Sequence, residues 1–203
     1  MTAILKVDTI QDTAGNNIIN ESSDTITIGA SGDTIALAGT TVTGITQGIT
    51  MADQWRVSTG FTGSAAPITS NWERNDTAPS LSYFGSQMTE SSGVFTFPST
   101  GIYYVSFHAN FKINGDSRYN YTLIKGTTNG STLITLTEAG TFIQQTQSNT
   151  TYANSNSEIM VDVTNTSNIK VAFEINVANS GVETLCNGTR DVTFVRFIRL
   201  GDT

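Results

Sequence analysis

Residues 93–111 read GVFTFPSTGIYYVSFHANF, and this stretch carries most of the information about the fold. After Gly101 every second side chain is apolar, which is the two-residue period of a β-strand. Residues 94–97 form a second β-prone run, and the Pro-Ser-Thr-Gly sequence at 98–101 predicts a turn. We therefore expect a hairpin whose apolar face is covered by another sheet. The predicted apolar face carries Tyr103, Val105, Phe107, Ala109 and Phe111.

The rest of the chain after residue 50 repeats this two-residue period, and no window has the 3.6-residue period of a helix. In one late run Val171, Phe173 and Ile175 share a face, and in the last run Phe194 and Ile198 share one. Strands this apolar need a covering layer, so the chain is predicted to be all-β, a two-layer sandwich of the jelly-roll type. The expected strands cover residues 54–57, 81–88, 94–97, 101–111, 119–125, 132–137, 158–163, 169–177 and 192–200.

Composition narrows the class of function. The 203 residues include 10 Lys and Arg against 17 Asp and Glu, which gives a net charge of −7. An acidic chain repels a phosphate backbone, so we expect no nucleic-acid partner. No stretch approaches the ~20 apolar residues that span a bilayer, so we expect no membrane insertion. The single cysteine, Cys186, excludes an intrachain disulfide framework.

Residues 1–50 differ from the rest, because they contain no aromatic side chain and repeat short motifs of Gly, Thr, Asp and Ile. The triplet Asp-Thr-Ile begins at Asp8, Asp24 and Asp33, and the last two triplets read as a short strand followed by a turn. Such units bury too little apolar surface to be stable alone. We expect a thin β-stalk over residues 1–50, intertwined with neighbouring chains, and a head over residues 51–203. A flexible linker is the alternative for the first segment.

The expected head has more apolar surface than one subunit can hide. With one face of each strand in the sandwich interior, the opposite faces are predicted to carry Ile102, Tyr104, Val195 and Phe197. A soluble monomer rarely exposes so many large apolar side chains together. We therefore expect these residues to contact neighbouring subunits in a closed ring.

The spacing of Phe95 and the run Gly101-x-Tyr103-x-Val105-x-Phe107 resembles the central signature of the C1q/TNF-like jelly rolls, which form compact trimers. The wider text is similar to C1q-like fibre proteins of marine bacteriophages. Shared stretches include VSTGFTG, ITSNWERNDT, the closing VRFIRLGDT and the N-terminal segment KVDTIQDTAGNNIIN. The resemblance covers nearly the whole chain and implies a homotrimeric virion fibre that is made in the host cytoplasm.

Three polar connections, residues 113–118, 148–157 and 178–190, are expected at one end of the head. If the stalk and the C-terminus leave from the other end, as the resembling fold implies, these loops form the free tip. Polar loops on a rigid scaffold are common recognition sites, and their groups suit a cell-surface glycan. Plain solvated turns are the alternative. The candidate binding residues are Asp116, Arg118, Tyr152, Asn154, Asn156, Glu183, Asn187 and Arg190.

We expect no enzymatic activity. His108 is the only histidine, and Ser106, two residues away on the same strand, is ~7 Å from it with no acid to orient the ring. Cys186 has no histidine partner close in sequence, and the carboxylates are scattered rather than paired. No metal or phosphate motif is present, so no cofactor is expected, although calcium bound by loop oxygens stays open as an alternative.

These observations favour a trimeric virion fibre that attaches to the particle through residues 1–50 and presents its head to the host surface. The expected partners are two further copies of the chain, other virion proteins and a host glycan. A capsid decoration or cement protein with a purely structural role is the main alternative. A polysaccharide depolymerase is a more distant one.

Overall fold

The computed structural model describes residues 9–11, 13, 17–22, 25–28, 48–80 and 82–203. The chain divides into two compact units, Met1–Ile45 and Thr46–Thr203. The division lies close to residue 50, where aromatic side chains begin in the sequence. Each unit forms its own sheets.

The first unit contains β1 (Thr9–Gln11), β2 (Asn17–Ser22) and β3 (Thr25–Ile28), which form an antiparallel sheet in that order. Ile10 pairs with Ile19, and Ile19 pairs with Ile28, so one isoleucine from each strand forms a ladder across the sheet. These side chains are 40, 37 and 52 % exposed. The second Asp-Thr-Ile repeat thus enters a strand as expected, whereas the third lies outside the described residues.

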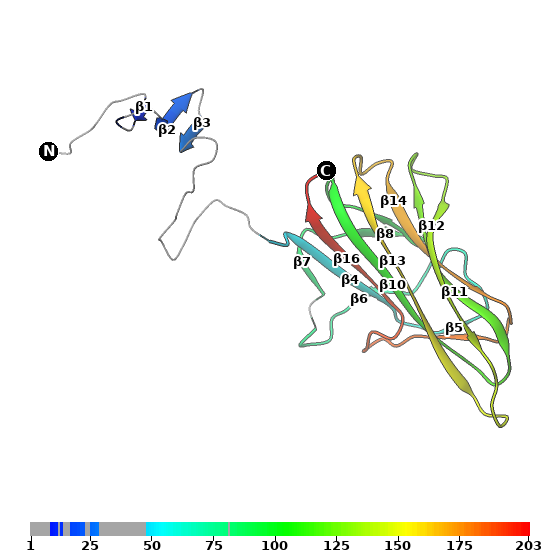
Figure 1. Ribbon diagram of the computed structural model, residues 1–203. Coiled ribbons are helices and arrows are strands. Elements are labelled where there is room, and N and C mark those ends of the chain that lie inside the picture. Colours follow the sequence, from blue (N-terminus) through cyan, green and yellow to red (C-terminus); the bar gives the residue numbers. More distant parts are fainter. Residues whose placement is uncertain (1–8, 12, 14–16, 23–24, 29–47, 81) are drawn as a thin grey trace. The chain divides into compact units, whose positions relative to one another are not determined.

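The second unit consists of two antiparallel sheets (Figure 1). One follows the order β5-β15-β10-β16-β4-β6, with β13 also paired to β10 and β7 to β4. The other follows the order β12-β11-β14-β9-β8. The strands are β4 (Met51–Val57), β5 (Phe61–Thr62), β6 (Trp72–Arg74), β7 (Tyr83–Gly85), β8 (Thr89–Ser91), β9 (Val94–Thr96), β10 (Gly101–Ile113), β11 (Ser117–Thr127), β12 (Ile134–Ile143), β13 (Thr151–Val163), β14 (Lys170–Val177), β15 (Glu183–Leu185) and β16 (Phe194–Gly201).

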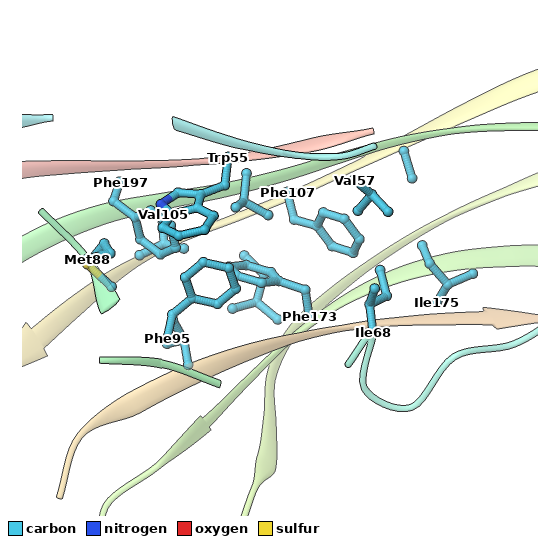
Figure 2. Close-up of a cluster of buried hydrophobic side chains, with 14 of the residues drawn as sticks. Trp55, Val57, Ile68, Met88, Phe95, Val105, Phe107, Phe173, Ile175 and Phe197 are labelled. Carbon is cyan, nitrogen blue, oxygen red and sulfur yellow. The ribbon is translucent and has the colours of Figure 1, made fainter. Parts of the chain in front are cut away.

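The core lies between the two sheets, and Figure 2 shows its central part. The predicted inner face of β10, from Tyr103 to Phe111, is fully buried. Phe95 of β9 and Phe173 of β14 meet Phe197 of β16 from the opposite sheet, with ring centroids 5.3 and 5.9 Å away. This edge-to-face and tilted aromatic packing joins the layers, and it confirms the predicted two-layer sandwich.

The predicted hairpin between residues 94–97 and the long strand is wrong. β9 pairs with β8 and β14, whereas β10 belongs to the other sheet. The turn at residues 98–100 crosses between layers, and the rings of Phe97 and Tyr103 pack in a tilted arrangement with centroids 4.7 Å apart. Both runs are apolar on one side, and crossing the core lets both apolar sides point inward. Side-by-side pairing in one sheet would leave the opposite layer without Phe95.

The real hairpin joins β8 to β9 through Ser92 and Gly93, which have φ angles of 51° and 83°. Positive φ at both central positions is typical of the type I′ turn that matches strand twist. Gly93 also lies against the backbone of Ile68, because a Cβ added there would be 2.2 Å from the Ile68 carbonyl oxygen.

We expect Gly93→Ala to lower the free energy of unfolding by about 2 kcal/mol or more, because the left-handed conformation and the backbone clash both oppose a side chain. Urea denaturation of the purified protein measures this change. Gly188→Ala is the matched control, because no atom lies within 4 Å of the added Cβ. Equal stabilities of the two variants would contradict the prediction.

The face of the last strand is the reverse of the expected one. Val195 and Phe197 are 0 % exposed and belong to the core, whereas Phe194, Ile198 and Leu200 face outward. Both sides of β16 are apolar, so alternation alone does not distinguish them. The register decides, because Val195 lies between Phe107 of β10 and Trp55 of β4, whose side chains point inward.

Candidate functional site

The strand register defines two ends of the second unit. Met51 pairs with Arg199, and Gly101 pairs with Val163, so the start of β4 and the C-terminal strand share one end. Ile113 pairs with Thr151 at the opposite end, which also holds the β10–β11 turn, the β12–β13 loop and the β14–β15 loop (Figure 1). We call this opposite end the tip.

Asp116 holds the tip loops together. Its Oδ1 accepts a hydrogen bond from the backbone N–H of Gln145 at 2.6 Å, which ties the β10–β11 turn to the β12–β13 loop. Its carbonyl oxygen accepts one from Nδ2 of Asn179 at 2.9 Å, which adds the β14–β15 loop. The side-chain amide of Gln145 donates a second hydrogen bond, from Nε2 to Asn114 Oδ1. Asp116, a predicted binding residue, is therefore a structural anchor of the tip.

Tyr152, Asn154 and Asn156 are on a strand and not in the predicted loop, because β13 begins at Thr151 and pairs with β10 along its whole length. Alternation does not reveal this first part of β13, because its inward positions are small or polar and include Ser155 and Ser157. Those hydroxyl-bearing side chains are buried and give no apolar alternation. Tyr152 is 66 % exposed on the outer face, where it remains available for contact.

Asn187 and Arg190 lie in the β15–β16 loop, at the level of Asn110 rather than at the outermost edge of the tip. Asn187 Oδ1 accepts hydrogen bonds from the backbone N–H groups of Thr189 and Arg190 at 2.8 and 3.0 Å. This side chain shapes its own turn. Glu183 forms a salt bridge with Lys112 at 3.1 Å from within β15. The predicted binding residues therefore do not converge on one pocket.

The outer face of the larger sheet carries an apolar row that the strand register assembles. Tyr104 lies opposite both Met160 and Ile198, Ile198 lies opposite Ala52, and Ala52 lies opposite Phe84. Met160 and Phe84 are 69 and 52 % exposed. We call these five residues the apolar row. Tyr104 and its neighbour Ile102 are on this outer face as predicted, whereas the buried Val195 and Phe197 offer nothing to a neighbouring subunit.

His108 is on the same outer face, closer to the tip. Its ring stacks on Phe194 with centroids 5.1 Å apart, and the Arg196 guanidinium lies 4.3 Å from the Phe194 centroid. Asn110 Nδ2 lies 3.1 Å from His108 Nε2. Burial, and secondarily the charge of Arg196, lowers the pKa of His108 below its usual value. No carboxylate from the described residues is bonded to the ring, and both burial and the Arg196 charge disfavour the imidazolium.

A lowered pKa means that the unfolded chain binds the His108 proton more readily than the folded chain does. The contribution of His108 to the free energy of unfolding is therefore fully present above about pH 6.5, the ordinary histidine pKa. It decreases as the pH falls below that value. We expect urea midpoints to fall between about pH 7.5 and about pH 5.5, and His108→Gln to flatten this slope. A slope that His108→Gln leaves unchanged would assign the effect to other groups.

Cys186 is shielded rather than activated. Burial raises the pKa of its thiol to about 12. A hydrogen bond with Thr193 acts in the opposite direction, and the nearby charge of Glu183 adds a smaller increase. The sulfur lies 3.7 Å from the Thr184 carbonyl oxygen. At neutral pH it is a thiol, which is a poor nucleophile.

Within the described part of the chain, no group of three or more His, Cys, Asp or Glu side chains is arranged to hold a metal ion. Among the same residues, no helix is long and apolar enough to cross a membrane.

Comparison with known proteins supports the fold. No protein-family model and no curated protein matches the sequence. Solved structures do match: the Eiger TNF of S. frugiperda has a TM-score of 0.54 over 75 % of this chain and 93 % of that chain, at 15 % identity. The fold is that of a TNF-like jelly roll. Murine APRIL at pH 5.0 gives a TM-score of 0.52 over 74 % of this chain and 98 % of that chain, at 14 % identity.

The TNF-like jelly roll also carries exposed aromatic residues that the sequence analysis did not single out. Phe142 is 68 % exposed, and Tyr119 is 37 % exposed and stacks on Tyr121 with centroids 5.1 Å apart. All three are on β11 and β12, near the tip. The one sequence feature that could have indicated them is the Tyr-x-Tyr pattern at Tyr119 and Tyr121, since the outward face of such a strand is usually polar.

Proposed function

We propose that this protein is a trimeric bacteriophage virion fibre, attached to the particle through its first unit and binding the host surface with the tip of its second. It acts by assembly and recognition, not by catalysis. The sequence resemblance to C1q-like phage fibres supports the assignment to a bacteriophage virion. The observation that carries the proposal is the apolar row on the outer face of the larger sheet, in a jelly roll whose long loops lie at the tip.

The apolar row needs a partner, because a soluble single chain rarely keeps such a surface exposed. A second apolar surface lies on the β12 edge, where Ile134 and Leu136 are 55 and 36 % exposed beside a hollow of about 120 Å³. Two different surfaces on one chain suit a head-to-tail contact that closes into a ring. A ring of three is the assembly that the sequence resemblance implies.

The isoleucine ladder of the first unit supports the stalk. A sheet of three short strands has little core of its own, and it exposes Ile10, Ile19 and Ile28 together. Packing the ladders of neighbouring chains against one another removes these side chains from water. The first unit is thereby stable only in the assembled fibre, as a thin stalk.

We expect Met160→Asp and Ile198→Asp to dissociate the trimer, since each places a carboxylate in a buried apolar contact. Sedimentation velocity should give three times the 21.7 kDa chain mass for the natural protein and one chain mass for the variants. Thr164→Asp, in the exposed loop after β13, is the matched control and should remain trimeric. A natural protein that sediments as a single chain at micromolar concentration would contradict the assembly.

Two measurements test the role of the assembly. Electron microscopy of virions with labelled protein should place it on a fibre, and deletion of residues 1–48 should leave a trimeric head that no longer joins particles. Purified protein should also bind host cells. Many copies on capsid symmetry positions, with a bare tail, would overturn the fibre in favour of capsid decoration.

A further inference from the structure

Three aromatic rings and an arginine form a platform at the tip end of the smaller sheet. We call Arg118, Tyr119, Tyr121 and Phe142 the aromatic platform. Tyr121 pairs with Gly140 across the strands, and a Cβ at Gly140 would be 2.3 Å from Tyr121 Cε1. The Tyr121 ring therefore lies directly over the glycine backbone. Tyr119 stacks on Tyr121, with an angle of 23° between their planes.

A β-bulge displays the charged member of the platform. Ser117 pairs with Ile143 and Asn120 with Thr141, so β11 holds two residues where β12 holds one. Arg118 and Tyr119, the two bulged residues, are both exposed. A bulge re-aims side chains in this way and is frequent beside binding sites. Among the described residues, the Arg118 guanidinium has no carboxylate partner, although five other basic side chains have one.

Two hollows flank Phe142, and both are lined by Phe142 and Arg118. One, of about 290 Å³, also contacts Tyr119 and Tyr121, and the other, of about 350 Å³, reaches Asp116 and Gln144. Their sizes are at the low end of small-ligand pockets, roughly 300–1,000 Å³. Apolar ring faces beside a free guanidinium and a few hydrogen-bonding groups form the mixed lining that such sites use.

The edge strand β12 is poorly suited to a peptide partner at this place. The Ser155 hydroxyl donates a hydrogen bond to the Ala139 carbonyl oxygen at 2.8 Å, which occupies an acceptor that an added strand would need. A ligand that lies flat on the rings needs no such acceptor. A pyranose ring presents such a flat C–H face, and its rim hydroxyls can reach polar groups.

We propose that the aromatic platform binds a pyranose unit bearing a carboxylate, as in an acidic glycan of the host surface. The sugar ring stacks on Tyr119 and Phe142, and Arg118 donates paired hydrogen bonds to the carboxylate, the planar geometry that guanidinium favours. In a chain of net charge −7, this unpaired cation compensates the anion locally. The inference rests on the proposed host-binding role and names a ligand class for it.

Saturation-transfer NMR with the full-length protein tests the site, using methyl β-glucuronoside and methyl β-glucoside as a matched pair. We expect the glucuronoside to bind at least about 10-fold more tightly, because a charge-assisted pair is worth that much. Arg118→Gln should remove this preference, and Tyr119→Ala and Phe142→Ala should each weaken binding about 3- to 10-fold. Lys170→Gln removes the same charge at the far end of β14 and should change nothing.

Three outcomes of the glycoside measurement would overturn the proposed site. They are absence of glucuronoside binding at millimolar concentration, equal affinity for both glycosides, and a preference that survives Arg118→Gln. Dissociation of the trimer by Phe142→Glu would also overturn it, because the ring would then be a subunit contact. Circular dichroism of each variant separates these results from unfolding.

Host-cell binding separates this inference from the proposed function. If the natural protein binds cells and the Arg118→Gln and Tyr119→Ala variants bind equally well, the platform is wrong and the host-binding role stands. If the natural protein binds no cells, the host-binding role fails, and the glycoside measurement still decides whether the platform recognises an acidic sugar.

Discussion

Phe95→Ala should lower the free energy of unfolding by about 3–5 kcal/mol, which is the usual range for removing a fully buried aromatic ring. Phe95 is 0 % exposed and touches four rings from both sheets. Its centroid lies 5.4 Å from Trp55, 5.2 Å from Trp72, 5.4 Å from Phe173 and 5.3 Å from Phe197. Removing the ring leaves a cavity at the point where the two layers meet. Urea denaturation at a fixed protein concentration measures the loss.

Phe142→Ala is the matched control for this prediction, because the same ring is removed from an exposed position. We expect it to change the free energy of unfolding by less than about 0.5 kcal/mol. A small effect of Phe95→Ala would show that the layers repack around the missing ring, and it would contradict the role assigned to the aromatic core.

Arg74→Ala should lower the free energy of unfolding by about 3–5 kcal/mol, because it leaves a buried carboxylate without its cation. The Asp53 side chain is 0 % exposed, and both of its oxygens lie 3.2 Å from the Arg74 guanidinium. The backbone N–H of Met88 also donates a hydrogen bond to Oδ2, at 2.7 Å. Arg74 also covers the Trp55 ring at 4.2 Å, so the substitution removes packing as well. Chemical denaturation measures this change.

A second substitution distinguishes the charge effect from the packing effect. Asp53→Asn in the Arg74→Ala background removes the unpaired charge, and we expect it to recover part of the lost stability. Lys112→Ala breaks a half-exposed pair with Glu183 and should cost no more than about 1 kcal/mol. If Asp53→Asn made the Arg74→Ala variant less stable still, the buried charge would not be the cause.

The candidate site was less accessible to sequence reasoning than the fold. The predicted connection at residues 113–118 lies at the tip. The first half of β13 is predicted as a loop and not as a strand, because Ser155 and Ser157 occupy its inner face. A buried serine needs a hydrogen-bond partner from another strand, as Ser155 has in the Thr122 hydroxyl at 2.9 Å, and the local sequence does not show that partner. Of the aromatic platform, the sequence predicts only Arg118 as a binding residue. Its rings come from two strands, and the place of Gly140 under Tyr121 depends on the pairing of those strands.

The sequence by itself determined that the chain is all-β, that its first 50 residues differ from the rest, and which residues of β10 share a buried face. Local alternation and composition contain that information, because the strand period is a property of neighbouring residues. Only the tertiary structure decided which face of β16 is buried, that β9 and β10 belong to opposite sheets, and that Met160, Tyr104, Ile198 and Phe84 form one row. These choices depend on register between distant strands, and a strand that is apolar on both sides fits either way until its neighbours are placed.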